Sequence, residues 1–92
     1  MSNILYVGID VSKCTNVVYI MLPNGKKQDV FSVDNSLYGA KLIAKSVANV
    51  LKHKKIKLAC FGLEATSIYA KNLIYFLNGM KLLNLLSIKS MN

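Results

Sequence analysis

The stretch ILYVGID at residues 4–10 has a counterpart later in the chain, LACFGLE at residues 58–64. Each is an apolar run that ends in an acid, Asp10 or Glu64, with a glycine two positions before it. Side chains alternate between the two faces of a strand, so each glycine clears space beside the acid on its own face. Oxygen ligands of this kind suit a hard cation. The repeated pattern favours a shared site over two solvated strand ends.

Further strand patterns surround these two runs. Residues 4–11 form a nearly continuous apolar run, which predicts a central strand buried on both faces. Residues 17–22 and 28–33 are rich in β-branched and aromatic residues, with a turn at residues 23–25 between them. Together these segments predict a three-stranded antiparallel meander.

The apolar spacing then changes to that of helices. Residues 34–36 offer N-caps for a first amphipathic helix whose apolar positions run from residue 40 to 51, with its lysines directed elsewhere. A strand over residues 57–63 follows, and Thr66 or Ser67 can cap a second helix that ends at residues 78–79. The apolar stripe of this second helix comprises Tyr69, Leu73, Phe76, Leu77 and Met80. Residues 81–88 predict a last strand.

This order of elements predicts one α/β domain with a mixed sheet, in which the meander is followed by helix, strand, helix and strand. Right-handed crossover connections place the later strands parallel to the first. If the fourth strand lies beside the first, Asp10 and Glu64 lie at adjacent carboxyl ends, little more than about 4.8 Å apart. Open α/β sheets bind their ligands at this edge.

The charge of the chain points to nucleic acid. The formal net charge is +8, and all 12 basic residues are lysines. Lysine suits phosphates as a point charge, so we expect contacts with the nucleic-acid backbone and no reading of base sequence. The candidate phosphate-binding residues are Lys13, Lys52, Lys54 and Lys55. A biased genome, or the solvated end of a helix over residues 52–57, is the alternative explanation.

Several classes of protein are disfavoured. A chain of 92 residues with 53% hydrophobic residues suits one small domain, and no apolar run approaches the roughly 20 residues of a membrane span. The first residues do not resemble a signal peptide, so a cytoplasmic location is expected. Cys14, Cys60 and His53 have no metal-ligand spacing, and Cys60 is expected in the core.

Two motifs carry a family resemblance. YVGIDVSK at residues 6–13 and FGLEATSIY at residues 61–69 resemble the start of the DEDD transposases of the insertion sequence 110 family. The likeness runs from about residue 6 to residue 79. It implies a RuvC-like domain of the ribonuclease H-like fold, in which Asp10 and Glu64 are the first two acids of a metal-binding tetrad. It also implies Mg²⁺ or Mn²⁺ as cofactor, DNA as substrate, a guide RNA as partner and an oligomeric full-length protein.

The chain departs from this family in several places. The family's other two acids lie farther along than this sequence extends, and Asp29 and Asp34 come too early to replace them, so we expect both on the surface. Ser67 stands where the family has glycine, and residues 83–92 do not continue its pattern. No serine here matches the one thought to attack DNA. These departures predict a partial domain, truncated after about residue 80–92, with weak metal binding and little or no activity.

Two other functions compete with this interpretation. Actin-like and sugar-kinase ATPases also open with a strand that ends in Gly-Ile-Asp, but they need backbone amides in small or glycine-rich turns for phosphate, and residues 11–15 contain no glycine. The other alternative is a non-catalytic basic remnant that binds nucleic acid. Loss of both acids would leave the binding of such a remnant intact.

Overall fold

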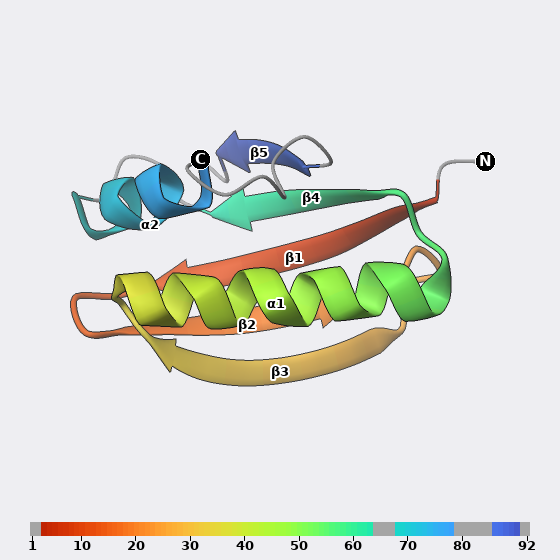
Figure 1. The fold of residues 1–92 in the computed structure, drawn as a ribbon, viewed down its shortest axis with the longest axis horizontal. Coiled ribbons are helices and arrows are strands. Elements are labelled where there is room, and N and C mark those ends of the chain that lie inside the picture. The colour runs from red at the N-terminus through yellow and green to blue at the C-terminus, as the bar shows by residue number, and fades with distance from the viewer. Residues whose placement is uncertain (1–2, 64–67, 79–85, 91–92) are drawn as a thin grey trace.

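The computed structural model describes residues 3–63, 68–78 and 86–90. Within these residues the chain forms a five-stranded mixed sheet in the order β3-β2-β1-β4-β5, together with two helices (Figure 1). The strands are β1 (Ile4–Val11), β2 (Thr15–Met21), β3 (Lys27–Asp34), β4 (Leu58–Leu63) and β5 (Leu86–Ser90). The helices are α1 (Leu37–Lys54) and α2 (Ile68–Asn78).

The strand pairing confirms the predicted topology. β2 pairs antiparallel with both β1 and β3, which makes the meander. β4 pairs parallel with β1, and β5 pairs parallel with β4, as crossovers through α1 and α2 require. The predicted element boundaries agree within about two residues except for the last strand, which begins at Leu86. Residues 81–85 of that prediction lie outside the described residues.

The core lies on one face of the sheet. On β1 the side chains of Leu5, Val7 and Ile9 are buried, and they join a single apolar cluster with residues of α1 and α2. Figure 1 shows α1 crossing this face of the sheet. The prediction that β1 is buried on both faces is wrong, because Tyr6 on the alternate face is 46% exposed. The two helices contact each other and cover the same face of the sheet. In the sequence, β1 has apolar residues at its inward and at its outward positions, and these hid the alternation between a buried and an exposed face.

We call the other side of the sheet the open face. Its residues on β1 and β2 are Ile4, Tyr6, Gly8, Asp10, Thr15, Val17, Tyr19 and Met21, and those on β3 and β4 are Val30, Ser32, Asp34, Leu58, Cys60 and Gly62. Cys60 was expected in the core, but its position in β4 turns it to this face, where it is half-buried. No described helix packs on the open face, so large apolar side chains such as Tyr19 remain exposed there.

Both ends of α1 are capped. At its start the Ser36 side chain accepts a hydrogen bond from the Gly39 amide at 3.1 Å, one of the cap positions that the sequence offered. At its end Lys55 adopts the left-handed conformation with φ 55°. The Ile56 amide then donates to the Leu51 carbonyl at 2.9 Å, which closes the last turn. The basic residues of this turn complement the negative end of the helix dipole.

The apolar stripe of α2 is confirmed in part. Leu73 and Leu77 are buried and Phe76 is partly buried against the core. Tyr69 was predicted in this stripe but is 38% exposed, since Ala70 takes the core-facing position in that turn. Thr66, Ser67 and Met80 lie outside the described residues. Neither described helix combines the length and hydropathy of a membrane-spanning segment.

Candidate active site at the carboxyl edge of the sheet

Asp10 lies where the sequence predicted an acid of the site. It is the penultimate residue of β1, the middle strand of the sheet order, and its side chain is exposed on the open face. Val17 of β2 is its cross-strand partner. No described side chain donates a hydrogen bond to the Asp10 carboxylate, so its oxygens face solvent. Its carboxylate can therefore accept an incoming cation or donor.

The two glycines of the repeated motif lie side by side. Gly8 of β1 and Gly62 of β4 are direct partners in the parallel register. Among the described residues, the nearest atom to a Cβ added at Gly8 would be the Tyr19 Cβ at 4.0 Å, which is ordinary contact distance. The open face beside Asp10 is therefore a strip of bare backbone that a ligand can approach closely.

Glu64 lies outside the described residues. β4 ends at Leu63, the residue before it, and the parallel pairing of β4 with β1 confirms that the two motif strands are neighbours. The meeting of the two carboxylates stays a prediction. Among the described residues no group of three or more potential metal ligands is found. Asp29 and Asp34 are exposed, as expected.

The turn between β1 and β2 is closed by its own hydrogen bonds. The Ser12 amide donates to the Thr15 carbonyl at 3.0 Å, and the Ser12 hydroxyl donates to the same oxygen at 2.6 Å. The Thr15 amide donates to the Ser12 Oγ at 3.3 Å. Lys13 lies exposed in this turn, three residues after Asp10. The turn thus carries an exposed lysine three residues after the acid, while two of its amides are already used.

Asn35 is a structural residue of this edge that the sequence analysis did not single out. Its Nδ2 donates to the Ser12 carbonyl at 2.9 Å and to the Tyr69 carbonyl at 3.3 Å. Its backbone amide donates to the Cys14 carbonyl at 3.0 Å. Asn35 therefore joins the turn after Asp10 to the starts of α1 and α2.

Asn16 completes this polar cluster. Its side chain is fully buried, its Nδ2 lies 3.4 Å from the Asn35 Oδ1, and its own Oδ1 has no partner among the described residues. The signal was present in the sequence, because Asn16 shares the alternation of Val18 and Ile20 on the core face of β2. A polar residue in such a position needs a hydrogen-bond partner elsewhere in the fold.

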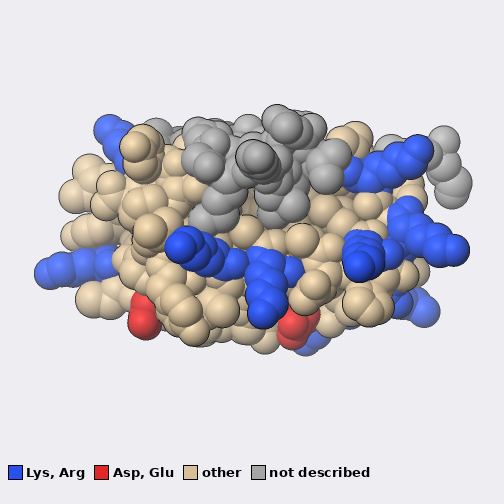
Figure 2. Space-filling view, in the orientation of Figure 1, with Lys and Arg blue, Asp and Glu red and all other residues tan. Residues whose placement is uncertain are grey.

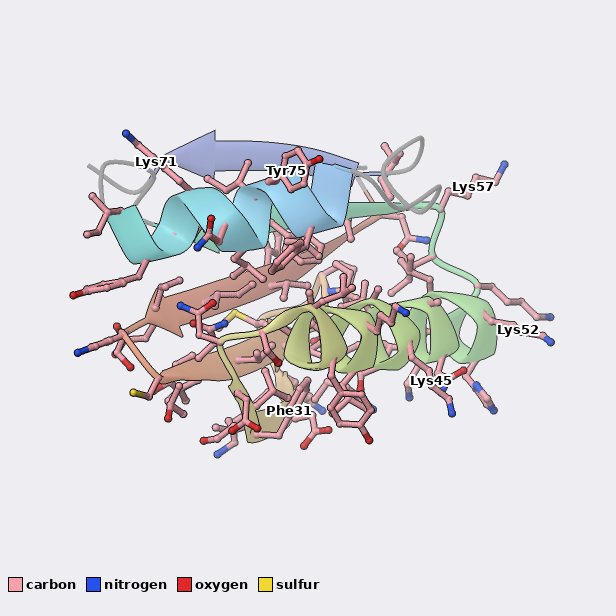
Figure 3. All side chains as sticks on the ribbon, turned by 60° about the vertical axis from the view of Figure 1, so that its left-hand side comes forward. Phe31, Lys45, Lys52, Lys57, Lys71 and Tyr75 are labelled. Atoms are coloured by element: carbon pink, nitrogen blue, oxygen red, sulfur yellow. The ribbon has the colours of Figure 1, made fainter. Side chains whose placement is uncertain are left out.

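The predicted phosphate-binding lysines do not lie together. Lys13 lies in the turn that follows Asp10 and β1, whereas Lys52, Lys54 and Lys55 lie at the far end of α1. That helix spans 18 residues, about 27 Å at 1.5 Å per residue. Figure 3 shows Lys52 and Lys57 at the end of the molecule away from Lys71 in the first turn of α2. The structure therefore separates the lysines into one group near the acid and another remote from it.

Comparisons with known proteins identify the fold. No protein-family model and no curated protein sequence matches the chain. Among matching structures is the Fowlpox virus resolvase in complex with Holliday junction DNA, with a TM-score of 0.51, 15% identity and coverage of 96% of this chain and 60% of the resolvase chain. Another is a Cytophaga hutchinsonii protein described as a sugar kinase, with a TM-score of 0.50, 15% identity and coverage of 96% and 36%.

These likenesses confirm the predicted fold class. The chain has the ribonuclease H-like fold, a mixed α/β sheet that resembles both the resolvase and the sugar kinase. It spans less than two thirds of either matched chain. Because one fold carries several activities, function has to be argued from the site.

Proposed function

We propose that this chain is part of a metal-dependent enzyme that cuts and rejoins DNA strands. The observation that carries the proposal is the placement of Asp10, exposed at the carboxyl end of the middle strand beside the paired glycines Gly8 and Gly62. The motifs at residues 6–13 and 61–69 support a finer assignment, the RuvC-like domain of a transposase related to the insertion sequence 110 family. The likeness to a resolvase solved with junction DNA agrees with a DNA substrate.

The described residues supply only part of a metal centre. A divalent ion, Mg²⁺ or Mn²⁺, would stabilise charge on the phosphodiester oxygens in such an enzyme. Asp10 alone does not make a binding site, since these ions need several oxygen ligands, and Glu64 is the second candidate. Gly8 leaves room for a sugar-phosphate backbone, and Lys13 can neutralise a neighbouring phosphate. We therefore propose weak metal binding by this chain.

The ATPase alternative is disfavoured by the turn after β1. A phosphate-binding turn presents free backbone amides to its ligand. Here the amides of Ser12 and Thr15 are engaged within the turn, at 3.0 Å and 3.3 Å. The likeness to a sugar kinase is one of fold, and the engaged amides of Ser12 and Thr15 leave those of Lys13 and Cys14 as the amides that the turn can offer to a phosphate.

Manganese should stabilise the wild-type chain, and this response should depend on both acids. We expect a gain of about 1 kcal/mol at ion concentrations several times the dissociation constant. For a domain of this size this gain corresponds to a rise in Tm of roughly 4–8 °C. Asp10→Asn and Glu64→Gln should abolish the rise. Thermal melts with and without manganese measure it.

The control for this experiment is Asp29→Asn, which removes an exposed acid on β3 and should keep the full response. Equal responses in all four proteins would contradict the site. A nicking assay on branched DNA adds a second readout, in which we expect weak cutting or none. Robust cutting by the wild-type chain would show that two further acids are not required.

The non-catalytic alternative has its own test. A remnant that only binds nucleic acid would retain its binding in the double variant Asp10→Asn/Glu64→Gln and would show no manganese response in the melts. A manganese response that depends on both acids would instead favour the enzyme.

A further inference from the structure

The lysines of α1 form a straight stripe on its outer side. Lys41, Lys45 and Lys52 lie within about 40° of one another around the helix axis at 3.6 residues per turn, and all three are exposed. The residues that α1 buries, among them Ile43 and Val47, face the sheet. The described carboxylates lie on β1 and β3, and none pairs with these lysines. The stripe therefore carries positive charge that no ion pair with a described carboxylate neutralises.

Three more lysines lie at the end of α1 and just past it. Lys54, Lys55 and Lys57 are exposed, and the chain that carries them is fixed by the buried Ile56 and by the Ile56 amide bond to Leu51. Lys55 and Lys57 line an open pocket with Asn3, Ile4 and Leu58. Figure 2 shows basic side chains over α1 and at this end of the molecule. We call the six residues Lys41, Lys45, Lys52, Lys54, Lys55 and Lys57 the lysine surface.

We propose that the lysine surface binds the sugar-phosphate backbone of a nucleic-acid duplex at a place separate from Asp10. α1 covers one face of the sheet, whereas Asp10 lies on the open face. Along α1 the surface begins near the carboxyl edge, with Lys41 about 6 Å past the first residue of the helix, and Lys52 lies about 22 Å past it at 1.5 Å per residue. The sheet therefore lies between a phosphate in contact with Asp10 and the lysines of α1.

The separation has a consequence for the substrate, which rests on the proposed function. The duplex segment held by the lysine surface differs from the segment presented to Asp10. Such a domain favours nucleic acid that offers two segments at once, either branched or sharply bent. Because lysine interacts with phosphates as a point charge, binding by the lysine surface is insensitive to base sequence, and its affinity falls steeply as the salt concentration rises.

Binding measured without metal tests the surface independently of catalysis. Labelled DNA and RNA duplexes of one sequence are titrated with the protein in the presence of EDTA, with fluorescence anisotropy as readout. We compare Lys41→Gln/Lys45→Gln/Lys52→Gln with the control Lys26→Gln/Lys27→Gln/Lys71→Gln, which removes the same charge elsewhere. Glutamine has nearly the helix propensity of lysine, so α1 is preserved, and circular dichroism checks this.

The α1 variant should lose roughly tenfold or more in affinity, and its slope of log K against log salt should fall by about 2–3, as expected for three phosphate contacts. The control variant should keep most of the wild-type affinity and most of the wild-type salt slope. If binding of the DNA duplex or of the RNA duplex depends on the α1 lysines, the result supports binding at the lysine surface. The duplex with the larger loss of affinity is the one that the surface prefers. Equal losses of affinity in the two variants, or no binding by the wild type at low salt, would contradict binding at the lysine surface.

Asp10→Asn tests the separation in the same assay. Since Asp10 lies on the other face, we expect unchanged affinity in EDTA. If Asp10→Asn raised the affinity by as much as the α1 variant lowers it, the duplex would lie against Asp10. That result would contradict the proposal that the two binding places are separate. This outcome is distinct from failure of the proposed function, which the manganese response reports.

Discussion

Replacing Gly39 by alanine should leave little folded protein. Gly39 is buried in the first turn of α1, and a Cβ atom there would run into the backbone carbonyl of Asp34. That carbonyl cannot move aside easily, because Asp34 pairs with Thr15 in the sheet and its oxygen accepts the Ser36 amide at 2.9 Å. We expect a loss of at least about 3 kcal/mol, at the upper end of overpacking costs. Urea unfolding followed by circular dichroism measures it.

The matched control is Gly8→Ala. An added Cβ there would meet the Tyr19 Cβ at 4.0 Å, so there is room for it. Glycine inside a strand is unfavourable, and we expect a gain of up to about 1 kcal/mol. The same methyl group would narrow the bare strip beside Asp10, so the manganese response and any cutting report whether that strip is used. Similar losses of stability in Gly39→Ala and Gly8→Ala would contradict the steric account.

Removing the Asn35 side chain should also destabilise the fold, by about 2–3 kcal/mol. The variant Asn35→Ala loses two donated bonds, to the carbonyls of Ser12 and Tyr69, and it deprives the buried Asn16 of its side-chain partner. An unpaired buried polar group costs about 1–3 kcal/mol. Thermal and urea unfolding measure the loss, and hydrogen exchange in the turn after β1 should increase.

A double variant separates the lost bonds from the unpaired group. Asn16→Leu/Asn35→Ala removes the orphaned polar side chain together with its partner, and replacement of both partners by apolar groups costs less than removal of one. We expect this variant to be more stable than Asn35→Ala alone. If it is equally or less stable, the Asn16 side chain is satisfied by another group and the account of this cluster is wrong.

Much of the fold could be predicted from local patterns. The strand order followed from the number and type of elements together with the right-handed crossover, which is a general property of twisted strands. The Ser36 cap and the helical spacing of α1 could also be predicted, because caps and amphipathic stripes depend on residues that are close in sequence. The neighbouring positions of β1 and β4, and hence of Gly8 and Gly62, also followed.

Other features depended on contacts between distant residues. Apolar side chains on both faces of β1 suggested two covered faces, but α1 and α2 pack on the same side, and only their packing decided that Tyr6 is exposed. The polar cluster around Asn35 joins segments 19 and 34 residues away from it, so no local pattern could show it.

The sequence by itself determined the fold class, the two motif strands and the position of Asp10 at a strand end, because these depend on alternation, spacing and chain handedness. Tertiary structure decided which face of the sheet Asp10 occupies and which lysines accompany it. Lys13 follows it along the chain, whereas Lys52 lies about 22 Å along α1 from its first residue, because a helix that packs antiparallel to its strand ends at the opposite edge of the sheet.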